Sequence, residues 1–226
     1  VAEAQAKGLT GKSWTDEFKR AFTQIAEFTG MYGVIRYVAQ DVPQQMIQAV
    51  SDVNKAQIEL VKVSNASTSD LSQYWNEATE SAKKYGSTIS DVISNTADWS
   101  RLGYSLDDAK KLSDVTTILQ KVGDNMTQQS ASQGLTATLK GFSMQADEAN
   151  KIVDIANEVA NTEPIDTSGL FEGLEKSASS LSAANNTLEQ SVSLITAANS
   201  VVQDPSSVGT AMKTKLLRNC LYVQKC

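Results

Sequence analysis

The sequence predicts an all-α protein, an array or bundle of antiparallel amphipathic helices. Apolar residues recur every three to four positions through most of the chain, and no stretch shows the strict alternation of a half-buried strand. Hydroxyl side chains stand where helices would begin, and glycines stand where helices would end. Only three prolines and twelve glycines interrupt the 226 residues, so long regular elements are possible.

Residues 1–63 are expected to form an N-terminal helical segment, for which an extended or coiled-coil form is left open. Ser13 is placed to cap a first helix that ends at Gly30, and Pro43 can open a second helix as its first residue. The predicted apolar stripes are Trp14, Phe18, Phe22, Ile25 and Phe28 in the first helix, and Met46, Ile47, Val50, Val53, Ile58 and Val61 in the second.

A polar run at residues 64–70 is the expected linker, and residues 71–214 are the expected helical module. Ser105 is a predicted cap, Pro205 a predicted break, and a last helix is expected over 208–217. The stripes of the module are Leu71, Trp75, Ala78, Ala82 and Tyr85 before Gly86; Ile89, Val92, Ile93 and Trp99 before Gly103; Leu106, Ala109, Leu112, Leu119 and Val122 before Gly123; Ala131, Leu135, Leu139 and Phe142; Ile152, Val153, Ala156 and Val159; Leu170, Leu174, Ala178 and Leu181; and Leu188, Val192, Ile195 and Val202.

The module repeats itself loosely at about forty residues, the length of a two-helix unit. GYSLDDAKKLSDV from Gly103 resembles GFSMQADEANKIVDI from Gly141 after a two-residue insertion, and TLEQSVSLITA from Thr187 resembles SLDDAKKLSDV from Ser105. Two interpretations stay open, because any capped amphipathic helix shares this pattern. Both predict stacked antiparallel helices with small residues at their close contacts.

The composition argues against several classes of function. The chain has no histidine, which removes the commonest general base and the usual zinc ligand, and we predict no enzyme, no catalytic residue, no cofactor and no metal site. The two cysteines, Cys220 and Cys226, both lie near the C-terminus, which favours a reducing compartment. A net charge of −6 with interspersed signs argues against nucleic acid as a partner. The most apolar run, 31–39, is short and contains Arg36, so no membrane span is expected.

Residues 6–13, AKGLTGKS, approach the phosphate-binding loop Gly-x-x-x-x-Gly-Lys-Ser but carry Ala6 in place of the first glycine. Such a loop works because a buried strand leads into a glycine-rich turn and a helix N-terminus receives the phosphate. Only the polar VAEAQ precedes the motif here. We therefore expect no nucleotide binding. Calorimetry with Mg-ATP would contradict this expectation if it gave a micromolar affinity that Lys12→Ala abolished.

Other residues that could suggest chemistry are expected to be structural. Asp107 and Asp108, like Asp16 and Glu17, fall in the first turn of a predicted helix, where the helix dipole favours negative charge. The tryptophans Trp14, Trp75 and Trp99 fall in phase with apolar stripes and are expected to anchor cores rather than to stack on a ligand.

Several blocks of the chain, taken in order, resemble the tape measure (minor tail) proteins of long-tailed bacteriophages and prophages. The blocks are LVKVSNAS at 60–67, AKKYGSTISDVISNTADWSRLGYSLDDA at 82–109, IVDIANEVAN at 152–161, SASSLSAANNTLEQSVSLITAAN at 177–199 and VGTAMKT at 208–214. The family continues after the last block into an arginine-rich stretch and a glycine. Residues 215–226 keep only Arg218 of that pattern and form an atypical tail.

The resemblance implies a structural role in virion assembly rather than a reaction. Tape measure proteins lie inside the growing tail and set its length, so the resemblance implies a place in the tail interior and, during assembly, in the host cytoplasm. The implied partners are other copies of the chain, tail tube subunits and tail assembly chaperones. We also expect the segment to self-associate through the outward side of 170–202, or to be only marginally stable, because helices rich in Ala and Ser bury little area.

One alternative is a helical bundle of a bacterial secreted or surface interaction protein, such as a toxin component or an adhesin stalk. Such a protein would be expected to carry a signal peptide and a hydrophobic hairpin, and we find neither pattern in the sequence.

Overall fold

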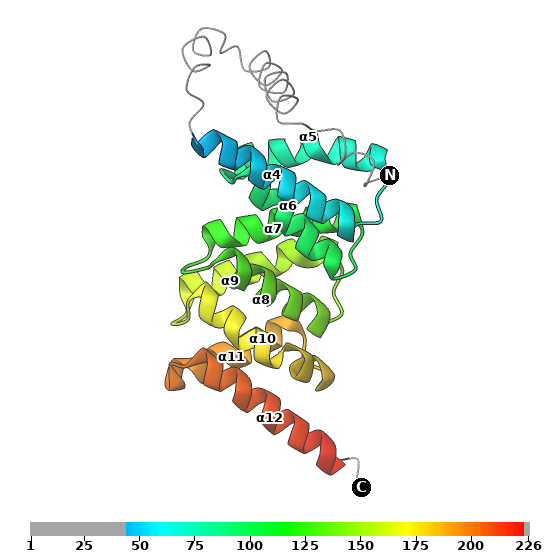
Figure 1. The fold of residues 1–226 in the computed structure, drawn as a ribbon. Helices are drawn as coiled ribbons and strands as arrows, with labels where there is room; N and C mark the ends of the chain where they lie inside the picture. The colour runs from blue at the N-terminus through cyan, green and yellow to red at the C-terminus, as the bar shows by residue number, and fades with distance from the viewer. Residues whose placement is uncertain (1–43, 224–226) are drawn as a thin grey trace, which may run out of the picture. The chain divides into compact units, whose positions relative to one another are not determined.

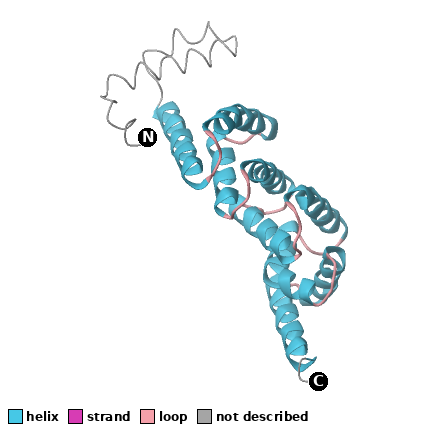
Figure 2. Cartoon of the chain, turned by 90° about the vertical axis from the view of Figure 1, so that its right-hand side faces the viewer, coloured by secondary structure: helices cyan, strands magenta, loops and turns pink. Residues whose placement is uncertain are grey.

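A computed structural model describes residues 44–223, with side chains from 48 to 215. The described residues form helices and their connections without any strand, which confirms the predicted all-α class (Figures 1 and 2). The helices are α4 (Gln44–Val63), α5 (Thr68–Tyr85), α6 (Ile89–Arg101), α7 (Leu106–Val122), α8 (Gln128–Gly141), the short 3-10 helix η1 (Ala146–Glu148), α9 (Ala149–Thr162), α10 (Thr167–Ala183), α11 (Leu188–Val202) and α12 (Pro205–Val223).

The chain divides into two compact units, Val1–Ser51 and Asp52–Cys226. The account below concerns the second unit. The helix predicted between Ser13 and Gly30 lies outside the described residues. The connection between α4 and α5 spans residues 64–67 because α5 already begins at Thr68, so the last three residues of the predicted linker are helical. The division of the chain into domains at 64–70 stays a prediction.

From α6 onward the helices form pairs of one repeating design. We call α6, α8 and α10 the first helices and α7, α9 and α11 the second helices. Thr88, Thr127 and Asp166 cap the first helices by accepting a hydrogen bond from the backbone N–H three residues on, and they recur at one constant interval of about 40 residues. Ser105, Gln145 and Thr187 precede the second helices at nearly the same interval, Gln145 through η1, which leads directly into α9.

The turn inside each pair has the same backbone geometry three times. The carbonyl of a buried residue accepts from the N–H five residues later: Trp99 from Tyr104, Leu139 from Met144 and Leu181 from Asn186, at 3.4, 2.8 and 3.1 Å. The residue before each donor has positive φ: 93° at Gly103, 54° at Ser143 and 61° at Asn185. This combination is the Schellman arrangement that ends helices. Its repetition favours a two-helix repeat over a chance likeness of capped helices.

The equivalent turns correct the predicted alignment of the first two copies. Gly103 was matched to Gly141, which required a two-residue insertion. By backbone geometry Gly103 corresponds instead to Ser143, because both residues adopt positive φ at the same place in the turn. No insertion is then needed, and Ala109 and Ala149, both fully buried, remain equivalent.

We expect opposite stability effects at these two equivalent positions. Gly103→Ala forces a side chain into positive φ and lowers the free energy of unfolding by about 1 kcal/mol, whereas Ser143→Gly relieves the same strain and raises it by a few tenths to about 1 kcal/mol. Urea unfolding followed by circular dichroism compares the two variants. Equal signs for both would contradict the assigned equivalence.

Glycines allow α8, α10 and α12 to pack closely. A Cβ added at Gly209 of α12 would lie 2.6 Å from the carbonyl oxygen of Gly173 in α10, and one at Gly141 of α8 would lie 2.7 Å from Cβ of Ala178. Gly134 of α8 similarly lies under the ring of Phe171. The small residues expected at close helix contacts are therefore found there, and they bring helix backbones together.

Hydroxyl groups join α6 to the helices beside it. Trp99 Nε1 donates to Thr116 Oγ1 of α7 at 3.1 Å, and the Tyr74 hydroxyl of α5 donates to Thr96 Oγ1 at 2.7 Å. Ser113 Oγ of α7 donates to the carbonyl of Val92 at 3.1 Å. These groups are buried, so their hydrogen bonds offset the cost of removing them from water.

Several predicted stripe residues are wrong in detail. On the part of α4 in the second unit the buried residues are Ala56 and Leu60, while Ile58 and Val61 are exposed, because this helix carries two apolar stripes and its neighbours cover only one. Val50, in the first unit, is exposed. Val122 and Val202, each the last residue of its helix, are also exposed.

The remaining differences concern the C-terminal end of the unit. Pro205 does not merely end α11; it is the first residue of α12, which runs to Val223 rather than to residue 217.

Candidate functional site

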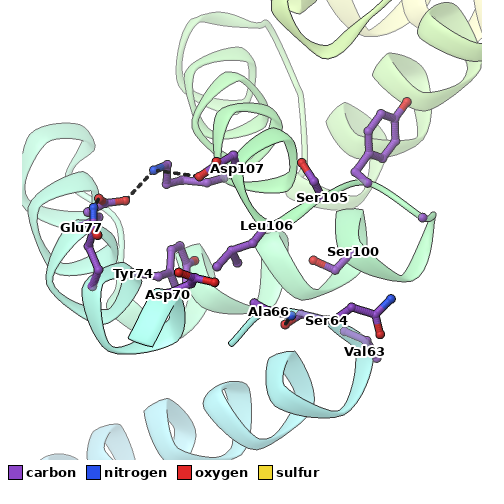
Figure 3. A pocket seen from close by; sticks show the side chains of 15 residues that line it. Val63, Ser64, Ala66, Asp70, Tyr74, Glu77, Ser100, Ser105, Leu106 and Asp107 are labelled. Carbon is purple, nitrogen blue, oxygen red and sulfur yellow. Dashed lines mark hydrogen bonds and ion pairs between the residues drawn. The ribbon is translucent and has the colours of Figure 1, made fainter. Parts of the chain in front are cut away.

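A polar hollow lies among α5, the connection that precedes it, and the turn between α6 and α7 (Figure 3). It has a volume of about 660 Å³. Asp70, Tyr74 and Glu77 line it from α5, and Asp107 and Lys110 line it from α7. Their positions follow from the caps, since Ser67 and Ser105 start α5 and α7 beside the hollow.

The charges in this hollow are largely paired. Lys110 Nζ lies 2.5 Å from Glu77 Oε2 and 3.8 Å from Asp107 Oδ1, as the dashed lines in Figure 3 show. Two hydrogen bonds hold the pKa of Glu77 below its usual value. The one from Lys110 has the larger effect, and the one from Gln73 has the smaller effect. Asp70 accepts from the backbone N–H of Ser67 at 3.2 Å and so completes a capping box. These carboxylates stabilise helices and helix contacts.

Two hydroxyl groups face or approach the hollow. Burial raises the pKa of the Tyr74 phenol, whose proton is donated to Thr96. Ser100 is 6 % exposed, and its hydroxyl has no hydrogen-bond partner among the described atoms. The lining residues offer hydrogen bonds to a small polar group. The carboxylates of the hollow, Asp70, Glu77 and Asp107, are held by a cap and by ion pairs to Lys110.

The acidic pair of the sequence has the structural role predicted for it. Ser105 Oγ accepts from the backbone N–H of Asp108 at 3.2 Å and donates to its carboxylate at 2.9 Å. The two aspartates lie in the first turn of α7, as expected from the helix dipole. The motif AKGLTGKS and the pair Asp16 and Glu17 lie outside the described residues.

The prediction that tryptophans anchor the core has a different outcome for each of the three residues. Trp99 is fully buried and anchors the main core, as predicted. Trp75 is only partly buried, and its neighbour Tyr74 occupies the core position instead, because the Tyr74 hydroxyl finds a buried partner in Thr96. Trp14 lies outside the described residues.

A pair of equivalent salt bridges links the second helices, and the sequence reasoning missed it. Lys111 Nζ of α7 lies 2.6 Å from Asp147 Oδ1 of η1, and Lys151 Nζ of α9 lies 2.6 Å from Glu189 Oε1 of α11. Lys111 and Lys151 stand six residues after Ser105 and Gln145, which precede their helices. Asp147 and Glu189 stand two residues after Gln145 and Thr187, the corresponding residues of the next pair. This recurring spacing of lysine and acid was the signal in the sequence.

The second of these salt bridges predicts a pH dependence. The hydrogen bond from Lys151, with further bonds from the backbone and from Thr187, lowers the pKa of Glu189 to about 2. Because the folded pKa lies below the unfolded value of about 4.3, the ionised carboxylate favours the folded state above that pH, and this contribution is lost as pH falls toward 2. Both side chains are about half exposed, so the effect is small and screened by salt.

The variant Glu189→Gln tests this dependence. The difference in urea midpoint between wild type and variant should be largest near neutral pH and should vanish as the pH approaches 2. Asp154→Asn, on an exposed side of α9, is the matched control for the loss of one carboxylate. A Glu189→Gln difference that grows on acidification would have the wrong sign for this salt bridge.

Neither a metal-binding cluster nor a membrane-spanning helix is found in the described part of the chain. Within residues 48–215, no three or more carboxylate, histidine or cysteine side chains gather closely enough to hold a metal ion. Across the helices described here, none combines the length and apolar character that spanning a membrane requires.

Comparison with known proteins gives one family. The sequence model of the family described as phage-related minor tail protein matches residues 76–219, which covers α6 to α11 completely and most of α5 and α12. No solved structure matches the chain.

Proposed function

Because the chain belongs to the phage-related minor tail protein family, and so has a structural role in the virion tail, we propose that it is the helical module of a tape measure protein. Three observations support this proposal. The family match spans the paired helices, the blocks at 82–109 and 177–199 resemble tape measure sequences, and each helix pair adds one equivalent unit to the array. The last observation carries most weight, because a ruler needs parts whose lengths add.

The proposal assigns no catalytic step and no cofactor to the chain. Its proposed partners are tail tube subunits, tail assembly chaperones and other copies of itself, in the tail interior and, during assembly, in the host cytoplasm. No nucleic acid is a proposed partner, in keeping with the net charge of −6. The family match favours this role over a toxin component or an adhesin stalk.

Deletion of one unit in the phage that encodes the chain tests length determination. Removing residues 127–165 brings Asp166 to the place of Thr127, so α10 follows α7 with an intact cap. Tails measured by electron microscopy should be shorter by a fixed amount, about 60 Å if the ruler lies along the tail as α-helix. Duplication of residues 127–165 is the matched control and should lengthen tails equally.

The possible results separate two levels of the proposal. Normal tail length in both variants would refute a ruler role and leave a structural tail role standing. Absence of tails in the deletion, combined with normal tails in the duplication, would also refute the ruler role, because a length change was expected in both.

A further inference from the structure

The helix α5 begins in the same way as the second helices. Ser67 precedes α5 as Ser105 precedes α7, and each serine accepts a hydrogen bond from the backbone N–H of an aspartate, Asp70 or Asp108, three residues further on. The two serines are separated by nearly the same interval as the later repeats. The junction between α5 and the pair α6–α7 can therefore be compared, residue by residue, with the two junctions that follow it.

The comparison places a glutamine where the later junctions have a lysine. Lys111 and Lys151 each reach an acid of the next pair at 2.6 Å. In α5 the same position holds Gln73, and the equivalent acid of the next pair is Asp107. The Asp107 side chain is 85 % exposed, and Lys110 Nζ lies 3.8 Å from its carboxylate. This junction therefore keeps the acid but has no lysine at the position that neutralises it in the later junctions.

Gln73 and Asp107 both line the polar hollow described above, together with Asp70, Glu77 and Lys110. Three carboxylates share one ammonium group there, so the lining side chains carry a net charge of −2. Lys110 lies closest to Glu77, at 2.5 Å. A cation in the hollow would therefore meet carboxylate oxygens that the lysine of the protein compensates only in part.

The hydroxyl of Ser100 points to a ligand independently of these charges. Ser100 lines the hollow, is 6 % exposed, and its hydroxyl has no hydrogen-bond partner among the described atoms. A buried hydroxyl without a partner is costly, so an N–H group of a bound molecule would stabilise it. In Figure 3 this hydroxyl is directed toward the middle of the hollow, and Leu106 lies between Ser100 and Glu77. The hollow thus has an acidic end, an apolar middle and a hydroxyl end.

We propose that the hollow binds an alkylammonium ligand, which is either a lysine side chain of another protein or a free diamine. The ammonium group lies between Asp107 and Glu77, in the role that lysines of the chain itself fill at the later junctions. The methylene stem lies against Leu106. An N–H at the far end of the stem, from the peptide group of the lysine or from the second ammonium group of the diamine, donates to Ser100. The volume of about 660 Å³ accommodates a ligand of this size.

Titration of the full chain with three probes at low ionic strength tests the ligand class, with amide NMR shifts as the readout. Nα-acetyl-lysine methylamide represents a lysine residue, and cadaverine represents a free diamine of similar length. Nα-acetyl-norleucine methylamide keeps the stem and the peptide groups without the ammonium group. At least one ammonium probe should bind about tenfold or more tightly than the norleucine probe, because only the ammonium group interacts with the carboxylates. The tighter of the two ammonium probes identifies the source.

Two results of this titration would overturn the proposal. One is equal binding of the norleucine probe and both ammonium probes. The other is the absence of shifts around the hollow with either ammonium probe at millimolar concentration.

Gln73→Lys is the decisive variant, because it supplies the lysine that the later junctions have. Its ammonium group should occupy the acidic end of the hollow and weaken the binding of the preferred probe about tenfold or more. Ser72→Lys adds the same charge at an exposed position of α5 that does not line the hollow, and it should bind the probe as the wild type does. Equal affinities of the two lysine variants would overturn the site.

Ser100→Ala and Asp107→Asn test the two ends of the hollow separately. Each should weaken binding of the preferred probe about threefold or more, the effect of one lost hydrogen bond. Folding should be kept, because the Ser100 hydroxyl has no partner in the protein and the Asp107 side chain is largely exposed. Urea unfolding checks this expectation. Unchanged affinity in both variants would refute the site and would leave the ruler role untouched, because the tail-length experiment tests that role.

Discussion

Trp99→Ala should lower the free energy of unfolding by about 3–5 kcal/mol, the range for truncating a fully buried large aromatic side chain. The indole fills the main core, donates to Thr116 at 3.1 Å and meets the ring of Tyr104 edge-on at 5.5 Å. Truncation also leaves the buried Thr116 oxygen without this donor. Denaturant unfolding monitored by circular dichroism measures the loss.

Trp75→Ala is the matched control, because it removes the same side chain from a position that is only partly buried. Its effect should be clearly smaller than that of Trp99→Ala. Comparable losses at the two positions would contradict the assignment of Trp99, rather than Trp75, as the core anchor.

Gly209→Ala should destabilise the packing of α12 on α10. The added Cβ would lie 2.6 Å from the Gly173 carbonyl oxygen and 3.1 Å from the Gly173 Cα, so two helix backbones must move apart. Overpacking of this kind costs about 1–3 kcal/mol, against a gain of about 1 kcal/mol from the better helix propensity of alanine. We therefore expect the thermal unfolding temperature of Gly209→Ala to be lower than that of the wild type.

The neighbouring Thr210→Ala controls for helix propensity, because Thr210 is exposed on the same helix. It should raise the unfolding temperature slightly, because alanine is favoured over threonine in a helix by up to about 0.7 kcal/mol. An increase in stability for Gly209→Ala would show that α10 and α12 do not approach as closely as described.

Local sequence signals predicted the helices well and the neighbours of each helix poorly. Ser105 and Gly86 mark a start and an end that the backbone confirms, because capping depends on residues within one turn. The apolar period of α4 was also real, yet Leu60 rather than Ile58 is buried. Which of two stripes is covered depends on distant helices, and periodicity within one helix carries no such information.

The candidate site shows the same division. The capping role of Asp108 follows from its place three residues after Ser105, and it could be predicted. The pairing of Lys110 with Glu77 joins residues 33 positions apart and depends on how α5 lies beside α7.

The pairing of helices also has a mechanical consequence. The main contacts join each helix to partners no more than two helices away along the chain, with η1 counted with α9. In such a linear array, stability is approximately a sum of local terms, so unfolding can begin at one end and advance pair by pair. A chain pulled from its end would release its pairs in succession, each yielding at most ~140 Å of extended polypeptide. The fold therefore resists tension one unit at a time, and a chain of this design can be drawn through a narrow passage without the whole core giving way at once.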